Sequence, residues 1–211
     1  MKTKPKVDVS FSSKASQELK SLKPIFEELC KVHESYTGAE PGGDFSYWYS
    51  ERPHIGLMAA AAWRRGFTAL EEYAAKKRKG QADVMGRCDL YIRTTSRTSF
   101  ECEAKHRSVN LGDPTGKSAG KVRKSLKQAA KEAAMLREPG QHHLGLCFAT
   151  LKIKKQKRDE LDERCHQLID RLKPLNGHSE CDALVWIHGE ALSDGGWRYP
   201  GLLLTVKEAR N

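Results

Sequence analysis

Long apolar stretches are absent from this sequence. Nowhere do roughly eighteen apolar residues, the minimum for a membrane-spanning helix, follow one another. The first residues, MKTKPKVDVSF, carry lysines but lack the apolar segment of a secretory signal. We therefore expect a cytoplasmic protein that neither crosses a membrane nor is secreted.

Metal-ligand spacing is also missing. The six cysteines form no CxxC pair and no cluster with histidine: Cys30, Cys88, Cys102, Cys147, Cys165 and Cys181. Several of them lie in apolar runs, where a reduced thiol packs as a small hydrophobic group. The eight histidines show no ligand spacing either. Reduced core thiols are the favoured interpretation, and a zinc site assembled from distant residues is the less favoured one.

Acidic residues are too few to balance the basic ones. The chain has 37 Lys and Arg against 27 Asp and Glu, a net charge of +10 and a pI near 9.3. This excess indicates a polyanionic partner such as nucleic acid. Charge alone does not establish that partner, because many basic proteins bind nothing anionic in particular.

Hydrophobic periodicity predicts a single domain over residues 1–211, with an N-terminal helical extension (1–49), a core (50–151) and a C-terminal elaboration (152–211). Helices are expected over 14–35, split near Pro24, then from Pro53 in a first turn to Arg65, over 117–137, and over 161–172. Strands are expected over 67–75, 86–93, 98–106, 143–151, 182–188 and 199–206. The glycine-rich loop YTGAEPGGDF (36–45) is expected to hold no regular element.

These elements describe an α/β fold with a mixed sheet flanked by helices. The continuous apolar run HLGLCFATL (143–151) is typical of a strand buried on both faces. Because a helix precedes it, this strand should lie parallel to the strand before that helix.

Charged residues gather on the predicted strand TSFECEAKH (98–106). Alternation places Glu101, Glu103 and Lys105 on one face, where charges are costly unless paired with each other, a metal or a substrate. If Arg93 and Thr98 flank the preceding turn, Asp89 lies opposite Cys102 and beside Glu103, and a slip of one residue makes Asp89 and Glu103 direct partners. The simpler interpretation is a cross-strand salt-bridge cluster.

These residue types suit phosphodiester hydrolysis. Asp89 and Glu103 would bind Mg²⁺ or Mn²⁺, which polarises a phosphoryl oxygen and activates water. Lys105 would orient or help deprotonate that water, with its pKa lowered by the neighbouring metal charge. Glu101 is expected to face solvent or to support the site.

Asp89 followed by Glu103-Ala104-Lys105 resembles the signature of the PD-(D/E)XK nuclease superfamily, an acid on one strand and acid-x-Lys on the next. Upstream, SERPHIGLMAAAAWRRGF looks like the opening helix of Holliday-junction resolvases, with Glu51 as its acid. The resemblance covers about residues 50–151 and implies a restriction-endonuclease-like α-β-β-β-α-β core, DNA cleavage and a supporting role for Glu51. Without it, Glu51 is simply a first-turn acid favoured by the helix dipole.

Two positions depart from that family. Cys88 stands where many members have proline before the acid. In helicase-linked exonucleases of the family a Gln-x-x-x-Tyr follows on the next helix, whereas here Gln128 is followed at that spacing by Glu132. Membership of that branch is therefore not implied.

The helix expected over 117–137 carries basic residues with little opposing charge before Glu132. Its predicted nucleic-acid-binding residues are Lys117, Lys121, Arg123, Lys124, Lys127, Gln128 and Lys131. A solvated helix face is the alternative interpretation.

Together these features predict a Mg²⁺- or Mn²⁺-dependent deoxyribonuclease. The alternative is a nucleic-acid-binding module or subunit with the same fold and no catalysis. RNA as substrate, or branched DNA cut by a homodimer, are further alternatives that the sequence does not separate.

Overall fold

The computed structural model describes residues 6–39, 46, 49–138, 140–154, 160–173, 180–192 and 195–209. Its strands are β1 (Val7–Phe11), β2 (Thr68–Lys79), β3 (Ala82–Arg93), β4 (Ser99–Asn110), β5 (His142–Lys154), β6 (Ala183–Leu192) and β7 (Trp197–Glu208). Its helices are α1 (Gln17–Lys20), α2 (Lys23–Ala39), α3 (Glu51–Arg64), α4 (Thr115–Ala133) and α5 (Leu161–Leu172). The predicted α/β class with a mixed sheet is confirmed.

One seven-stranded sheet has the order β1-β6-β7-β5-β4-β3-β2. The β4–β5 pair is parallel, as predicted from the helical crossover, and the other neighbouring strands are antiparallel. The sequence interpretation missed β1, because it predicted only helices and a loop within residues 1–49. That segment instead contributes an edge strand, whose partner β6 comes from the other end of the chain.

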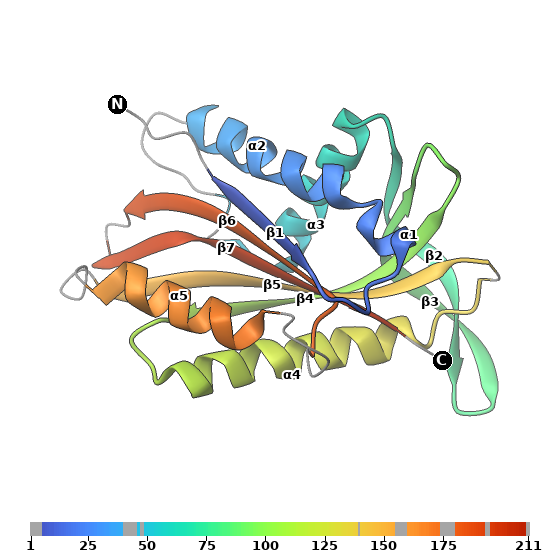
Figure 1. Cartoon of the computed structure of the whole chain (residues 1–211). Coiled ribbons are helices and arrows are strands. Elements are labelled where there is room, and N and C mark those ends of the chain that lie inside the picture. Colours follow the sequence, from blue (N-terminus) through green and yellow to red (C-terminus); the bar gives the residue numbers. More distant parts are fainter. Residues whose placement is uncertain are drawn as a thin grey trace.

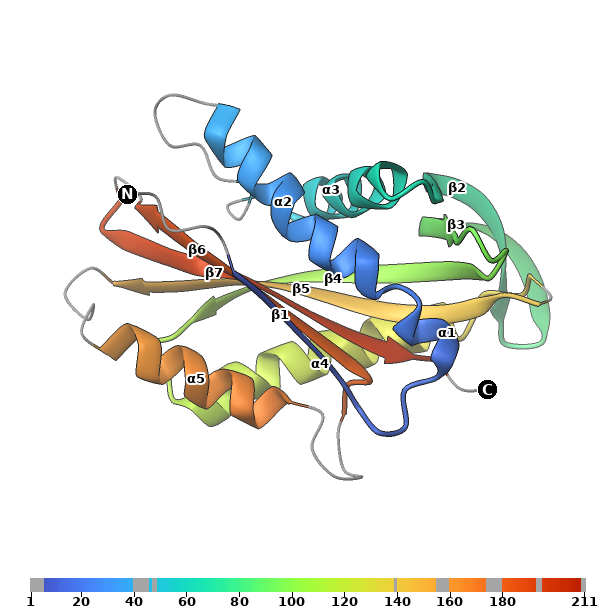
Figure 2. The same cartoon turned by 45° about the horizontal axis from the view of Figure 1, so that its top comes forward.

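Helices cover both faces of the sheet. Figures 1 and 2 show α2 and α3 over one face and α4 and α5 over the other. The face under α2 and α3 buries Phe100, Leu146 and Phe148, and the face under α4 and α5 buries Leu151 and Leu203. None of the described helices is long and apolar enough to cross a membrane.

Helix boundaries coincide with proline and glycine residues in the sequence. Pro53 lies in the first turn of α3, and Gly66 adopts a φ of 76° just beyond the C-cap residue Arg65. Residues 59–63 of this helix, AAAAW, are all apolar and would be expected to be buried, but Trp63 is 55% exposed. The N-terminal helical segment divides before Pro24 as predicted, but α2 continues through 36–39, where a loop was expected. Residues 40–45 of that loop lie outside the described residues.

All six cysteines are buried and form no disulfide, in agreement with the predicted core thiols. Burial raises the pKa of Cys88, Cys147 and Cys165 to about 12. These thiols are therefore protonated and unreactive at neutral pH.

Gly145 sets how closely α4 approaches the sheet. This residue pairs with Glu103 across the β4–β5 ladder. A Cβ at Gly145 would lie 2.3 Å from the backbone nitrogen of Ala130 and 2.5 Å from its Cα, closer than real contacts allow. Any side chain here must therefore push α4 away from the strand that carries Glu103 and Lys105.

Gly145→Ala is expected to lower the free energy of unfolding by about 1–3 kcal/mol through overpacking. Gly56→Ala is the matched control, because its added Cβ meets Glu71 only at 3.5 Å and α3 gains a better helix former. The control should gain up to about 1 kcal/mol. Urea denaturation of both variants measures the difference, and equal stabilities would refute the close packing of α4 at Gly145.

Candidate active site

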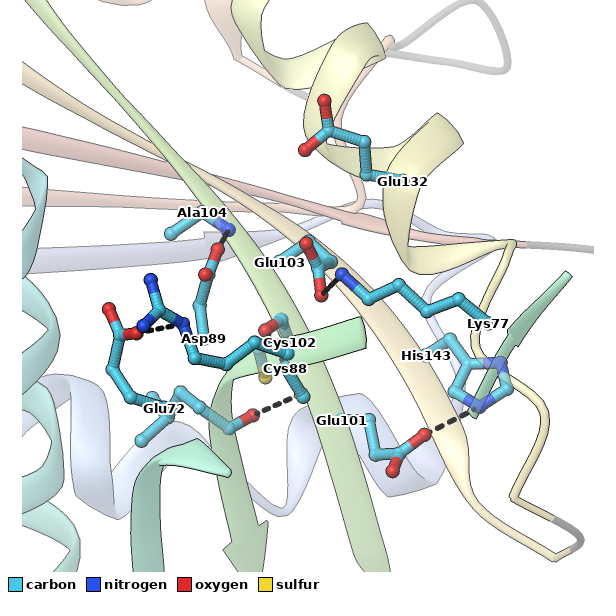
Figure 3. Close-up of polar contacts among 12 residues, drawn as sticks. Glu72, Lys77, Cys88, Asp89, Glu101, Cys102, Glu103, Ala104, Glu132 and His143 are labelled. Carbon is cyan, nitrogen blue, oxygen red and sulfur yellow. Dashed lines mark hydrogen bonds and ion pairs between the residues drawn. The ribbon is translucent and has the colours of Figure 1, made fainter. Parts of the chain in front are cut away.

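The site begins where two neighbouring strands separate. The β3–β4 ladder covers only Leu90–Arg93 with Ser99–Cys102, although each strand has twelve residues. Beyond this point side chains replace the ladder. Asp89 Oδ2 accepts a hydrogen bond from the backbone nitrogen of Ala104 at 2.8 Å, and Cys88 Sγ lies 3.5 Å from the carbonyl oxygen of Cys102 (Figure 3). The place where β3 and β4 diverge, beyond Leu90 and Cys102, is called the fork. Its side chains bind backbone polar groups that the ladder no longer pairs.

The observed register differs by one residue from the first prediction. Arg93 pairs with Ser99 and Leu90 with Cys102, so the same register sets Asp89 opposite Glu103. The placement of Asp89 opposite Cys102 is wrong, and the alternative with a one-residue slip describes the structure. The two acids that the sequence singled out come together at the fork.

The β2–β3 ladder is also interrupted at this level. Glu71 pairs with Leu90 and Tyr73 with Cys88, so Glu72 lies level with Asp89 without pairing to it. Glu72 has a φ of 54°, a left-handed conformation that is uncommon outside glycine. Its carboxylate forms ion pairs with Arg52 and Arg87. A strained, charge-anchored residue therefore marks the strand position beside Asp89.

Glu103 is almost fully buried and its charge is paired. Its side chain is 4% exposed, and its Oε1 lies 2.7 Å from Lys77 Nζ, which comes from β2 (Figure 3). Gly86 makes room for this reach, because a Cβ there would lie 2.9 Å from Lys77 Cδ. Burial raises the pKa of Glu103 to about 7, the ion pair with Lys77 opposes the rise, and Asp89 adds to it.

Lys105 points to the C-terminal part of α4. Its Nζ lies 2.7 Å from Glu132 Oε2 and donates to the Ala104 carbonyl oxygen at 2.8 Å. Burial acts to lower the pKa of Lys105, but the carboxylates of Glu132, Glu51 and Asp89 raise it overall. With the chain's own residues around it, Lys105 is therefore an ammonium ion at neutral pH. The lower pKa expected beside a bound metal stays a prediction.

Glu51 joins this group from the first turn of α3. Its carboxylate accepts a hydrogen bond from the backbone of His106 and interacts electrostatically with Lys105, Asp89 and Glu132. Burial raises its pKa, the Lys105 charge opposes the rise, and the Asp89 charge adds to it. The structure thus brings together all four residues predicted to form the site.

Glu101, in contrast, belongs to a separate contact. It is completely buried, accepts a hydrogen bond from the Tyr73 hydroxyl, and lies 3.2 Å from His143 Nε2. The expectation of a solvent-facing Glu101 is wrong. His143 also lines a cavity of about 540 Å³ together with Leu136, Arg137 and Glu208. Asp89, Glu103 and Lys105 are not among the residues that line this cavity.

Lys77 and Glu132 are the members of the site that sequence reasoning missed. Lys77 is one of four consecutive basic residues, and nothing in that run marks which one turns inward. Glu132 carried a weak signal as the first acid on an otherwise basic helix, four residues after Gln128. In the structure Gln128 Nε2 donates to Glu132 Oε1 at 2.6 Å.

The basic helix α4 has two kinds of residue. Four of its lysines are exposed: Lys117, Lys124, Lys127 and Lys131. Lys121 is paired with Asp113 at 2.9 Å, and Arg123 binds Glu180 at 3.2 Å and the carbonyl oxygen of Arg171 at 2.6 Å. A role in nucleic-acid binding stays a prediction for this helix, with the exposed lysines as its accessible part.

The charge balance at the fork fits a divalent cation. The ionisable members of the cluster are Glu51, Asp89, Glu103 and Glu132 with Lys77 and Lys105. Full ionisation leaves two negative charges in excess, and the raised pKa values of Glu51 and Glu103 express this imbalance together with burial. Within the described residues no group of three or more His, Cys, Asp or Glu side chains is arranged to hold a metal ion. The carboxylate pair Asp89 and Glu103 therefore needs water or substrate oxygens to complete a metal's coordination.

Comparisons with protein-family models, curated proteins and solved structures find no match for this chain.

Proposed function

We propose that this protein is a metal-dependent nuclease that hydrolyses phosphodiester bonds in DNA. The observation that carries the proposal is the fork itself, where Asp89 and Glu103 share one level of adjacent strands and Lys105 lies two residues further along. The cluster also has more carboxylates than ammonium groups, an excess of negative charge that a divalent cation would balance. The resemblance to the PD-(D/E)XK superfamily and the net charge of +10 support the same proposal.

In this proposal Asp89 and Glu103 hold Mg²⁺ or Mn²⁺, which supplies a Lewis acid and an activated water. Asp89 is oriented for this role because the Ala104 N–H binds only its Oδ2. Glu103 would exchange its Lys77 partner for the metal ion. Lys105 contributes its ammonium group, which lies 2.7 Å from Glu132, to the negatively charged scissile phosphate. Glu51 and Glu132 position Lys105.

Incubation of plasmid and linear DNA with Mg²⁺ or Mn²⁺ tests this proposal. The native chain should cleave DNA only with the metal present, and Lys105→Ala should cleave it far more slowly. Equal cleavage by the two proteins would show that the activity does not come from this site.

One observation favours a second candidate, a nucleic-acid-binding module without catalysis. Both Glu103 and Lys105 already have partners within the chain, Lys77 and Glu132, at 2.7 Å each. A binding module would hold DNA with an affinity that falls steeply with salt and does not depend on a divalent ion. It would cleave no DNA under any metal condition.

A further inference from the structure

The β2–β3 hairpin extends well beyond the short segment of β3 that pairs with β4. Its outer part, residues 76–87, is named here the distal ribbon. β2 is one of the two edge strands of the sheet, and β4 pairs with β3 only from Leu90 onward. Figures 1 and 2 show the hairpin projecting at the end of the molecule that holds β2 and β3. A segment after α4 steadies it, because Arg78 N donates to the Met135 carbonyl oxygen at 2.6 Å.

One face of the distal ribbon combines cations with an exposed apolar side chain. Lys76 pairs with Met85 in the ladder, and alternation places Arg78 and Arg87 on the same face. Met85 is 67% exposed, more than the other large apolar side chains that the structure leaves open. Three of the ribbon's cations already have acid partners: Lys77 binds Glu103, Arg78 binds Asp83 and Arg87 binds Glu72. Lys76 and Lys79 are exposed and form no ion pair with any residue that the structure describes.

We propose that the distal ribbon binds in the major groove of double-stranded DNA. A two-stranded antiparallel ribbon has the width that this groove admits, whereas the major groove of A-form RNA is too narrow to enter. Lys76, on the face of Met85, and Lys79, on the opposite face beside the turn, contact the phosphates on either side of the groove. Met85 makes apolar contact with base edges such as the thymine methyl group. The positive charge of the ribbon complements the negative charge of the duplex.

The ribbon is connected directly to the candidate active site. Lys77 belongs to the ribbon and contacts Glu103, while Lys76 and Arg78 on either side of it are exposed. A duplex held by the ribbon therefore lies next to the fork that carries Asp89. This inference rests on the proposed function for its substrate, and it narrows that substrate to duplex DNA.

Fluorescence anisotropy with a labelled duplex and its separate single strand tests the ribbon. EDTA is included, so that binding is measured without cleavage and its failure is distinct from a failure of the nuclease proposal. Lys76→Gln combined with Lys79→Gln should lower the slope of log affinity against log salt by about 2. The matched control, Lys23→Gln with Lys154→Gln, removes the same charge from exposed positions away from the ribbon and should leave the slope unchanged.

Met85→Ala separates groove binding from simple charge attraction. It should weaken duplex binding about fivefold, because alanine lacks most of the apolar side chain that Met85 would bury against the bases. Single-strand binding should be unchanged. Urea denaturation checks that each variant keeps native stability, as expected for exposed positions. The proposal would be overturned if Lys76→Gln with Lys79→Gln bound the duplex as tightly as the control pair does. It would also be overturned if Met85→Ala weakened duplex binding and single-strand binding equally.

Discussion

Lys105→Ala is expected to reduce metal-dependent DNA cleavage about a thousandfold, in the range that a positioned proton-transfer or charge-stabilising group contributes. The reason is geometric. Lys105 brings the cluster's solvent-accessible ammonium group beside the two acids, since its side chain is 30% exposed while that of Lys77 is 18% exposed. Removing it leaves developing charge on the phosphate without a nearby cation.

Initial rates of plasmid cleavage measure this loss, with unfolding by urea recorded for each protein. Lys154→Ala is the matched control, an exposed lysine near the end of β5, and it should cleave at the native rate. Lys105→Ala also frees Glu132 from its partner, so Glu132→Gln is a second comparison that leaves the ammonium group in place. A rate for Lys105→Ala within about tenfold of the native rate would remove Lys105 from the chemistry.

Acid is expected to destabilise the fold through two buried histidines. His33 and His54 lie between α2, α3 and the sheet, fully buried, with ring centroids 5.9 Å apart. His54 also stacks on Phe148 at 5.3 Å. Burial lowers the pKa of each to about 3, from 6.5. Because the unfolded chain takes up these protons below pH 6.5 and the folded chain does not, stability falls as pH drops from 6.5 toward 3.

At pH 5 each histidine should cost about 2 kcal/mol relative to pH 7.5. His54→Phe isolates one of them, because phenylalanine keeps an aromatic ring in the stack and does not titrate. The unfolding free energy of the variant minus that of the native chain should increase by about 2 kcal/mol between pH 7.5 and pH 5, as measured by urea denaturation. A difference that stays constant with pH would contradict this account.

Regular elements were predictable where local patterns decide them. The strand alternation around Glu103 and the turn after Arg93 indicated the meeting of Asp89 and Glu103 to within one residue of register. The pleat fixes which side chains share a face, but the register depends on the turn, which the sequence did not specify. The ends of α3 and the parallel pairing of β5 with β4 also followed from local signals in the sequence.

Features that depend on distant partners were not predictable. β1 is five residues long, and it is a strand because β6 offers an edge that is distant in the sequence: Val9 pairs with Val185. Lys77 and Glu132 were missed for the same reason. Their inward direction comes from the space above Gly86 and from the approach of α4 over Gly145, which are properties of packing rather than of either segment alone.

Calorimetric titration with Mn²⁺ tests the central claim most directly, since it asks whether the carboxylates at the fork bind a divalent ion at all. The native chain should bind Mn²⁺, and Asp89→Asn should lose that binding while remaining folded. Asp113→Asn, which changes an acid paired with Lys121 away from the fork, should bind as the native chain does. Native protein that takes up no Mn²⁺, or Asp89→Asn that takes up as much as the native chain, would contradict the account.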